Sequence, residues 1–322
     1  MNRAPEEKAA RTAEQARAVL DRVGGAVVGN REPLRLTLAA VLAGGHVLLE
    51  DLPGLGKTLT ARSFAQALGL DFARAQFTPD LLPADLTGAY VYDQRAGTFE
   101  FRRGPLFTGL LLADEINRTP PKTQSALLEA MAENQVTAEG RTYPLPQPFH
   151  VLATANPVEY EGTYPLPEAQ LDRFLLRLSF GHPGEEEEQE VLRRRLARQQ
   201  EDITLEAVTD AEGLREMQRA VEEVPVEEDI SAYCVRLAGA TRQSSSVQVG
   251  ASPRGSLALV LVARAYAVIS GRGHIVPEDV KAVAHAVLGH RIVLKPELWM
   301  SGATAGAVVH QALGAVPVPG TR

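Results

Sequence analysis

Cysteine, long apolar runs and excess positive charge are all scarce in this chain of 322 residues. The only cysteine, Cys234, excludes an internal disulfide, so we expect a reducing compartment such as the cytoplasm. The longest apolar stretch, residues 256–270, is too short to span a bilayer and contains Arg264, so we expect no direct membrane insertion. A net charge of −7 argues against a protein that mainly coats nucleic acid.

Apolar runs of strand length alternate with helical patterns through the first part of the chain. Such an alternation predicts an α/β fold, a doubly wound parallel sheet covered by helices on both faces. The strand patterns cover residues 46–50, 73–77, 110–114, 150–155 and 175–180, and the helical patterns cover residues 11–30, 59–69 and 121–134.

Two segments break this alternation and predict β-hairpins inserted into the sheet. Residues 89–102, "AYVYDQRAGTFEFR", carry alternating aromatic residues on both sides of a glycine-containing turn. Residues 135–146, "QVTAEGRTYPLP", predict a second hairpin.

From residue 185 onward we find only helical patterns. A helix after residue 252 has a serine N-cap, a proline at its first position and a glycine after its end. Cys234 shares one helix face with Ile230, Tyr233 and Leu237, so we expect a buried structural thiol rather than a nucleophile. We therefore predict an α/β domain over residues 1–183 and an all-helical domain over residues 184–322.

The stretch "DLPGLGKT", residues 51–58, resembles the phosphate-binding pattern G-x-x-x-x-G-K-[ST], although Asp51 replaces the first glycine. Gly54 and Gly56 permit the tight curl that lets backbone N–H groups converge on a phosphate. Lys57 is placed to reach the β- and γ-phosphates, and Thr58 to offer a hydroxyl to Mg²⁺. Because the missing glycine precedes the cradle, we expect Asp51 to lie outside it and Asp51→Gly to leave nucleotide binding largely intact. The alternative is a chance glycine-rich turn.

The apolar strand "LLLADE" ends in Asp114 and Glu115. Since the carboxyl ends of parallel strands share one edge of a sheet, both acids should lie beside the phosphate loop. Asp114 could then hold Mg²⁺ and Glu115 could polarise an attacking water. The alternative is a solvated acidic turn, which the separate strand and the spacing from Lys57 make less favoured.

Three further residues complete the expected site. Asn156, after the strand in "VLATANP", could orient water, and the alternative is an Asn-Pro turn. Arg173 in "QLDRF" could reach the phosphates of a neighbouring subunit, and the alternative is an ion pair with Asp172 or Glu168. Arg254 in "SPRG" could close onto the γ-phosphate, and the alternative is an exposed helix arginine.

Taken in order, these motifs resemble those of AAA+ ATPases, and specifically of the MoxR family. The resemblance extends from about Val27 nearly to the C-terminus, and "EDxPGxGKT" is a common form of the loop in that family. The carrying stretches are "VVGN", "LLEDLPGLGKT", "QFTPDLLPADLTG", "LLLADEINRTPPKTQSALLEAMAENQVT", "ATANPVEYEGTYPLPEAQLDRF" and "GASPRG".

The resemblance implies a role for each candidate residue. Asn156 would be the first sensor, Arg254 the second sensor, and Arg173 a finger acting in trans, with Arg118 and Arg177 as competitors for that role. The catalytic residues would be Lys57, Glu115, Asn156, Arg173 and Arg254. The metal would be bound by Thr58 and Asp114. The residues assigned to the nucleotide are Val28 and Gly29 at the adenine, with Pro53, Gly54, Leu55, Gly56, Lys57, Thr58 and Leu59. The hairpins would be the helix-2 insert (about 86–105) and the pre-sensor hairpin (about 134–146).

The function implied is that of a ring-forming, usually hexameric, chaperone-like ATPase that uses ATP and Mg²⁺. Members commonly act with von Willebrand A-type domain proteins to mature a client or to insert its metal or cofactor. Two alternatives stay open, a nucleotide-gated scaffold with little turnover and a nucleic-acid-dependent motor. The preference for ATP over GTP rests on the resemblance alone.

Overall fold

The apolar runs of the first part form a five-stranded parallel sheet in the order β2-β5-β8-β1-β9. The computed structural model describes residues 3–157, 162–200 and 203–320. The predicted strands are confirmed, and their bounds are β1 Val47–Glu50, β2 Phe72–Gln76, β5 Leu110–Asp114, β8 His150–Ala155 and β9 Leu176–Leu178.

Both faces of the sheet are buried, and successive side chains of a strand enter two separate apolar clusters. In β5, Leu110 and Leu112 join one cluster, whereas Leu111 joins the other. This follows from the two-residue period of a strand. Helix α3 packs on the first face through Phe64 and helix α5 on the second face through Leu127, so the predicted cover on both faces is confirmed.

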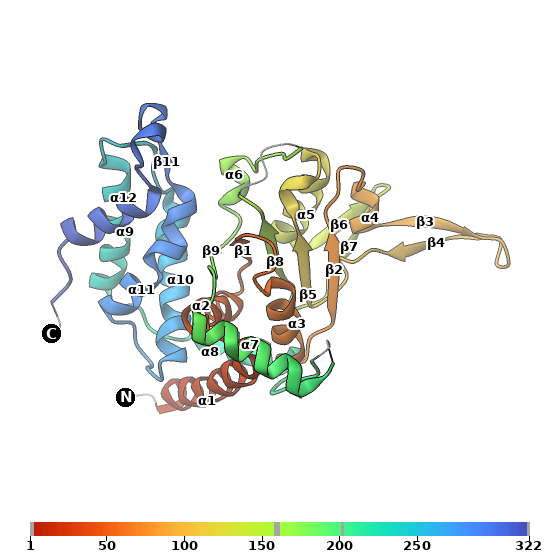
Figure 1. Cartoon of the computed structure of the whole chain (residues 1–322), viewed down its shortest axis with the longest axis horizontal. Coiled ribbons are helices and arrows are strands. Elements are labelled where there is room, and N and C mark those ends of the chain that lie inside the picture. Colours follow the sequence, from red (N-terminus) through yellow and green to blue (C-terminus); the bar gives the residue numbers. More distant parts are fainter. Residues whose placement is uncertain (1–2, 158–161, 201–202, 321–322) are drawn as a thin grey trace.

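Along the chain, the helices of this part come before the first strand and between the later ones (Figure 1). The first helix begins earlier than the predicted residue 11 and ends at residue 26, because alanines at helical spacing (Ala9, Ala13 and Ala16) are buried against the body. The helices are α1 Arg3–Ala26, α2 Arg31–Leu42, α3 Lys57–Ala67, α4 Pro83–Thr87, α5 Pro121–Glu133 and α6 Glu168–Leu171, with a 3-10 turn η1 Ile116–Arg118.

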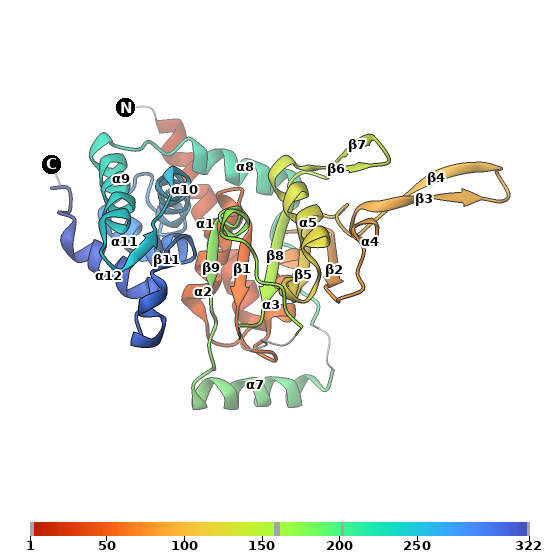
Figure 2. The same ribbon diagram turned by 90° about the horizontal axis from the view of Figure 1, so that it is seen from above.

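Both predicted hairpins are present and extend to the same side of the molecule, beyond β2 (Figure 2). The longer pairs β3 Gly88–Asp93 with β4 Thr98–Arg103, and the shorter pairs β6 Gln135–Ala138 with β7 Arg141–Pro144. Their bases are joined, because the rings of Phe101 and Tyr143 stack with centroids 4.2 Å apart.

The second part is built of helices, as predicted, with one addition. Strands β10 and β11 form a small antiparallel pair, which corrects the expectation of helices alone. Both are too short to produce a readable period in the sequence. The elements are α7 Glu185–Arg198, α8 Ala211–Glu222, α9 Glu228–Gln243, β10 Val247–Val249, α10 Pro253–Ile269, α11 Pro277–Leu288, η2 Gly289–Arg291, β11 Val293–Leu294, η3 Pro296–Ser301 and α12 Ala305–Ala315.

Two local predictions for these helices are confirmed. Ser252 caps α10 by accepting from the N–H of Arg254 at 3.2 Å. Cys234 is fully buried with its predicted face partners, and burial raises the pKa of its thiol to about 12. A thiol held in this way stays protonated and unreactive. In the described part of the chain, no helix has the length and apolar character needed to cross a membrane.

A buried ion pair joins the sheet region to the helices after residue 184. Nε of Arg291, in η2, lies 2.7 Å from Oδ1 of Asp172, and its Nη2 donates to the backbone oxygen of Phe174 at 2.8 Å. The Arg291 side chain is only 4% exposed. The apolar cluster on the α3 face also continues into the later helices, so the boundary at residues 183 and 184 stays a prediction.

We expect Arg291→Ala to lower the free energy of unfolding by about 3–5 kcal/mol, because it leaves the Asp172 carboxylate without its buried partner. Chemical denaturation measures the change. Lys8→Ala is the matched control, since Lys8 pairs with Glu223 at 2.8 Å but both side chains are about half exposed, and it should change stability by less than about 1 kcal/mol. Equal effects of the two substitutions would contradict the prediction.

Candidate functional site

The phosphate loop leaves β1 at residue 51 and enters α3 at Lys57. Gly54 (φ 84°) and Gly56 (φ 76°) both take the left-handed conformation that the curl requires, and a Cβ on either would meet open space. Glycine is therefore needed here for the backbone and not for packing. The loop faces a cavity of about 580 Å³.

The cavity brings together five of the residues predicted to act in catalysis or metal binding. Lys57, Thr58, Asp114, Glu115 and Asn156 all line it, although they come from α3, the end of β5 and the end of β8. Further lining residues that the sequence did not single out include Arg62, Arg74 and Gln76. The basic side chains in the wall are those of Lys57, Arg62 and Arg74. Together with the backbone N–H groups of the phosphate loop, they suit a polyphosphate.

Lys57 lies over the start of the loop. Its Nζ donates to the backbone oxygens of Asp51 at 2.7 Å and Leu52 at 3.2 Å. Burial lowers the pKa of its ammonium, while the nearby charges of Asp51, Asp114 and Glu115 act in the opposite direction. The lysine is thus held at the mouth of the cradle, where it can reach phosphate oxygens.

The side chain of Asp51 points away from the cradle, as expected, but it is not a passive replacement for glycine. Its carboxylate accepts from the hydroxyl of Ser179 and the N–H of Phe180, both at 2.6 Å, and from the N–H of Gly181 at 3.2 Å. The residue is 5% exposed. Asp51 therefore ties the phosphate loop to the segment that leaves the sheet after β9.

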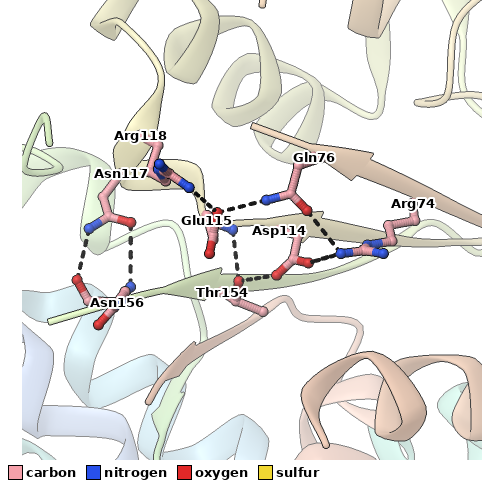
Figure 3. Close-up of polar contacts among 8 residues, drawn as sticks. All are labelled: Arg74, Gln76, Asp114, Glu115, Asn117, Arg118, Thr154 and Asn156. Atoms are coloured by element: carbon pink, nitrogen blue, oxygen red, sulfur yellow. Dashed lines mark hydrogen bonds and ion pairs between the residues drawn. The ribbon is translucent and has the colours of Figure 1, made fainter. Parts of the chain in front are cut away.

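The acidic pair occupies the end of β5 (Figure 3). Oδ1 of Asp114 accepts from the hydroxyl of Thr154 at 2.6 Å, and Oδ2 accepts from Nη2 of Arg74 at 2.6 Å. The hydroxyl of Thr154 also accepts from the N–H of Glu115 at 2.8 Å. Thr154 on β8 thereby holds both acids in register.

Glu115 has an unusual backbone and two side-chain donors. Its φ of 58° is left-handed, a conformation that few non-glycine residues adopt. Its Oε2 accepts from Nε2 of Gln76 at 2.7 Å and lies 3.0 Å from Nη1 of Arg118 (Figure 3). These two contacts orient the carboxylate of Glu115 in the cavity.

The donor set fits a Mg²⁺ ion. Thr58 and Asp114 present a hydroxyl and a carboxylate to the same cavity, and oxygen ligands of this kind suit Mg²⁺. Among the described residues there is no cluster of three His, Cys, Asp or Glu side chains that could hold a metal without further ligands. This agrees with the usual Mg²⁺ arrangement, in which substrate phosphates and waters complete the coordination.

Asn156 is 5% exposed and sits directly after β8. Its backbone is held by Asn117, whose Nδ2 donates to the Asn156 oxygen at 3.0 Å and whose Oδ1 accepts from the Asn156 N–H at 3.4 Å. Asn117 was missed by sequence reasoning. Its place in η1, just after the acidic pair, is the only signal that could have found it.

A second cavity of about 510 Å³ adjoins the first and contains most of the expected nucleotide residues. Val28 and Leu55 line it, and both cavities are lined by Pro53, Gly54, Gly56 and Leu59. Gly29 is not in its wall. A Cβ on Gly29 would lie 2.6 Å from the carboxyl carbon of Glu187, so this glycine lets α7 approach.

The arginines are placed differently from one another. Arg173 is exposed and donates to the backbone oxygen of Leu128, while its neighbour Asp172 pairs with Arg291. Arg177 lies 3.1 Å from Glu50. Arg254 begins α10. Within the described ranges, the walls of the two cavities contain neither these arginines nor Arg118, so the finger and second-sensor roles stay predictions.

Comparison with known proteins agrees with this arrangement. A family described as "ATPase family associated with various cellular activities (AAA)" matches residues 46–176, and an AAA lid domain matches residues 239–312. The protein YeaC of Bacillus subtilis is 50% identical over 94% of this chain and 94% of its own. Chaperone MoxR1 of Mycobacterium tuberculosis is 41% identical over 91% of this chain and 79% of its own.

A solved structure gives the same picture. It comes from Cytophaga hutchinsonii, is described as a candidate ATPase, and superposes with a TM-score of 0.92 at 41% identity. The match covers 99% of both chains, so the sheet, the hairpins and the later helices are shared as one arrangement.

We expect Asp51→Ala to lower the free energy of unfolding by about 1–3 kcal/mol, because three donors, of which the Phe180 N–H is buried, lose their acceptor. The same loss of stability is expected for Asp51→Gly, because it removes the same carboxylate, while its nucleotide binding is still expected to stay largely intact. Thermal and chemical denaturation measure the change, with the exposed Asp21→Ala as the control. A stability equal to that of the unaltered protein would show that Asp51 does not anchor the loop.

Proposed function

Since the chain belongs to the MoxR family of AAA+ ATPases, we propose that it is a Mg²⁺-dependent ATPase that remodels or matures a protein client. The observation that carries the proposal is the 580 Å³ cavity, where Lys57, Thr58, Asp114, Glu115 and Asn156 converge on one phosphate loop. These are the parts that phosphoryl transfer to water requires.

Each group in the cavity has a role in the proposed hydrolysis that follows from its chemistry. The backbone N–H groups of the loop and the Lys57 ammonium bind the phosphates. Mg²⁺, held by Thr58 and Asp114, would neutralise charge on the β- and γ-phosphates. Glu115 orients a water and accepts its proton as the water attacks the γ-phosphorus, while the Asn156 amide holds that water in line. The products are ADP and phosphate.

The second cavity supports a place for the base. Val28, Leu55 and Leu59 provide apolar surface next to the loop, and α7 closes the opposite side with Val191 and Leu192. An apolar slot beside a phosphate cradle fits a flat base. ATP rather than GTP is proposed from the family alone.

Catalysis across subunits is part of the proposal. Arg173 is exposed at the end of α6, and its side chain is aligned by the Leu128 oxygen rather than consumed in an ion pair with Asp172 or Glu168. An exposed, aligned arginine suits stabilisation of phosphate charge in a neighbouring copy. We accordingly propose a ring of identical subunits, with six as the expected number.

The proposal that this ATPase acts on a protein client is drawn from the names of its relatives. One relative is named a chaperone, which supports work on a protein client. A von Willebrand A-type protein as partner, a cytoplasmic location and metal or cofactor insertion as the outcome are proposed from the family resemblance. A scaffold with little turnover is the alternative, and undetectable phosphate release at high protein concentration would favour it.

We expect Glu115→Gln to retain nucleotide affinity but to slow phosphate release by about a hundredfold or more, since the base is lost while the cradle is intact. Lys57→Ala should instead weaken binding itself by more than about tenfold, because a charge-assisted contact to phosphate is removed. Fluorescent-nucleotide binding and a phosphate-release assay separate the two effects. Normal turnover by Glu115→Gln would contradict the assigned base.

We expect Arg173→Ala to bind nucleotide normally and to lose most of its turnover. Mixing it with Lys57→Ala should restore activity, because a ring then contains sites with intact cradles that face intact arginines. Phosphate release from the mixture, compared with each variant alone, measures this. Recovery with Arg177→Ala or Arg118→Ala in place of Arg173→Ala would assign the finger to that residue.

A further inference from the structure

The cavity proposed for the base has two walls that come from distant parts of the chain. One wall contains Val27 and Val28, directly after the end of α1, and the other contains Val191 and Leu192 of α7. Because no short connection joins these two segments, noncovalent contacts must fix the distance between the walls.

Helix α7 has little apolar packing to hold it in place. The structure describes all of its residues, and none of them is buried. Val191 is 44% exposed and Leu192 is 59% exposed. Figure 2 shows α7 lying apart from the sheet. Since burial of an apolar face is what normally fixes a helix in a protein, the polar contacts of α7 decide where it lies.

Arg194 joins α7 to the end of α1. Its Nη1 donates to the backbone oxygen of Gly25 at 2.8 Å and to that of Gly24 at 3.2 Å. The last four carbonyls of a helix lack partners within the helix, and positive charge is favoured there. The last turn of α1 contains no basic residue of its own, so the guanidinium supplies both the donors and the charge.

Two carboxylates of α7 support this contact. Glu190, one turn before Arg194, accepts from its Nε at 2.6 Å and so orients the guanidinium. Two turns before Arg194, the carboxyl group of Glu187 lies against Gly29, where a Cβ would be only 2.6 Å from the carboxyl carbon. Residues 187, 191 and 194 share one face of the helix. Val191 therefore lies between the two points at which α7 touches residues 24–29.

We propose that Arg194 is a positioning residue that holds α7 against the end of α1 and thereby sets the width of the slot for the nucleotide base. It acts through Val191 and Leu192, and the inference rests on the proposed ATPase function. Without Arg194, α7 moves away and the base loses contacts on one side, since dispersion attraction falls steeply with a small gap. The phosphate cradle, which other elements build, stays intact.

The test measures the dissociation constant of a non-hydrolysable ATP analogue with Mg²⁺. Arg194→Ala should weaken binding by about three- to tenfold, the range expected for loss of hydrogen bonds from a charged donor. The KM for ATP should rise by a similar factor, whereas turnover at saturating ATP should change by less than about twofold, because the base is bound equally in the ground state and the transition state. An unchanged affinity, or a loss confined to turnover, overturns the proposal.

Two neighbouring arginines provide matched controls. Arg195 lines the same cavity from α7 and carries the same charge, but it forms no hydrogen bond with α1 in the part of the chain that the structure describes. Arg193 pairs with Glu190, as Arg194 does, and is 76% exposed. Arg195→Ala and Arg193→Ala should each weaken binding less than Arg194→Ala. Equal weakening by Arg195→Ala would assign the effect to charge alone, and equal weakening by Arg193→Ala would assign it to the pair with Glu190. Either result overturns the contact with α1 as the cause.

Leu192→Ala tests whether Arg194 acts through the apolar wall. Alone it should weaken binding by about twofold or more, because apolar surface next to the base is lost. In the Arg194→Ala background its effect should be smaller, since the wall is already displaced. Additive effects, or no effect of Leu192→Ala alone, overturn this link. If the unaltered protein binds no analogue, the proposed function fails and the inference fails with it, whereas equal binding by all variants sinks only the inference.

Discussion

The parallel pairing of β5, β8 and β1 is the constraint on which the site depends. In this register Ala113 pairs with Ala153 and Leu49 with Thr154, so the three strands end at the same level. The phosphate loop, the acidic pair and Asn156 follow these ends directly. Because parallel strands all present their carboxyl ends to one edge, three segments far apart in the chain meet around one cavity.

Burial on both faces keeps that register in place. Leu48 enters the cluster on the α5 side, whereas Leu49 enters the cluster on the α3 side. A slip of one residue would exchange the two side chains between cores that are already packed. The same slip would move the phosphate loop relative to Asp114. Core packing and site geometry are thus consequences of a single alignment.

The negative charges of the two acids in the cavity are balanced by donors, and these contacts also orient the two carboxylates. Asp114 and Glu115 lie close together, and like charges at this spacing repel unless donors approach them. Arg74 and Arg118 supply those donors, Thr154 contacts both acids, and Gln76 joins Glu115 to Arg74. The chain as a whole carries a charge of −7, yet the walls of this cavity gather Lys57, Arg62 and Arg74. Overall charge therefore says little about what a local site attracts.

The sequence by itself determined the strands, the two hairpins, most of the later helices and the phosphate loop, because these follow from local rules. Alternation with a period of two, glycine at left-handed positions and caps at helix ends are all read within a few residues. The sequence also predicted that Asp114, Glu115 and Asn156, at the ends of apolar strands, would lie beside the phosphate loop, and all three line the main cavity. It did not single out Arg62, Arg74 or Gln76, because no local pattern marks them. The short pair β10 and β11 could not be predicted either, because two or three residues carry no period.

Only the tertiary structure decided which partners these residues have. Asp51 reaches the segment after β9, Arg74 reaches Asp114 across two strands, and Asp172 pairs with Arg291 rather than with Arg173. Each choice joins groups that lie roughly 40 to 130 positions apart, where several donors and acceptors compete. Ion pairs and hydrogen bonds are selected by distances of a few ångströms, and only the packed sheet and helices set such distances.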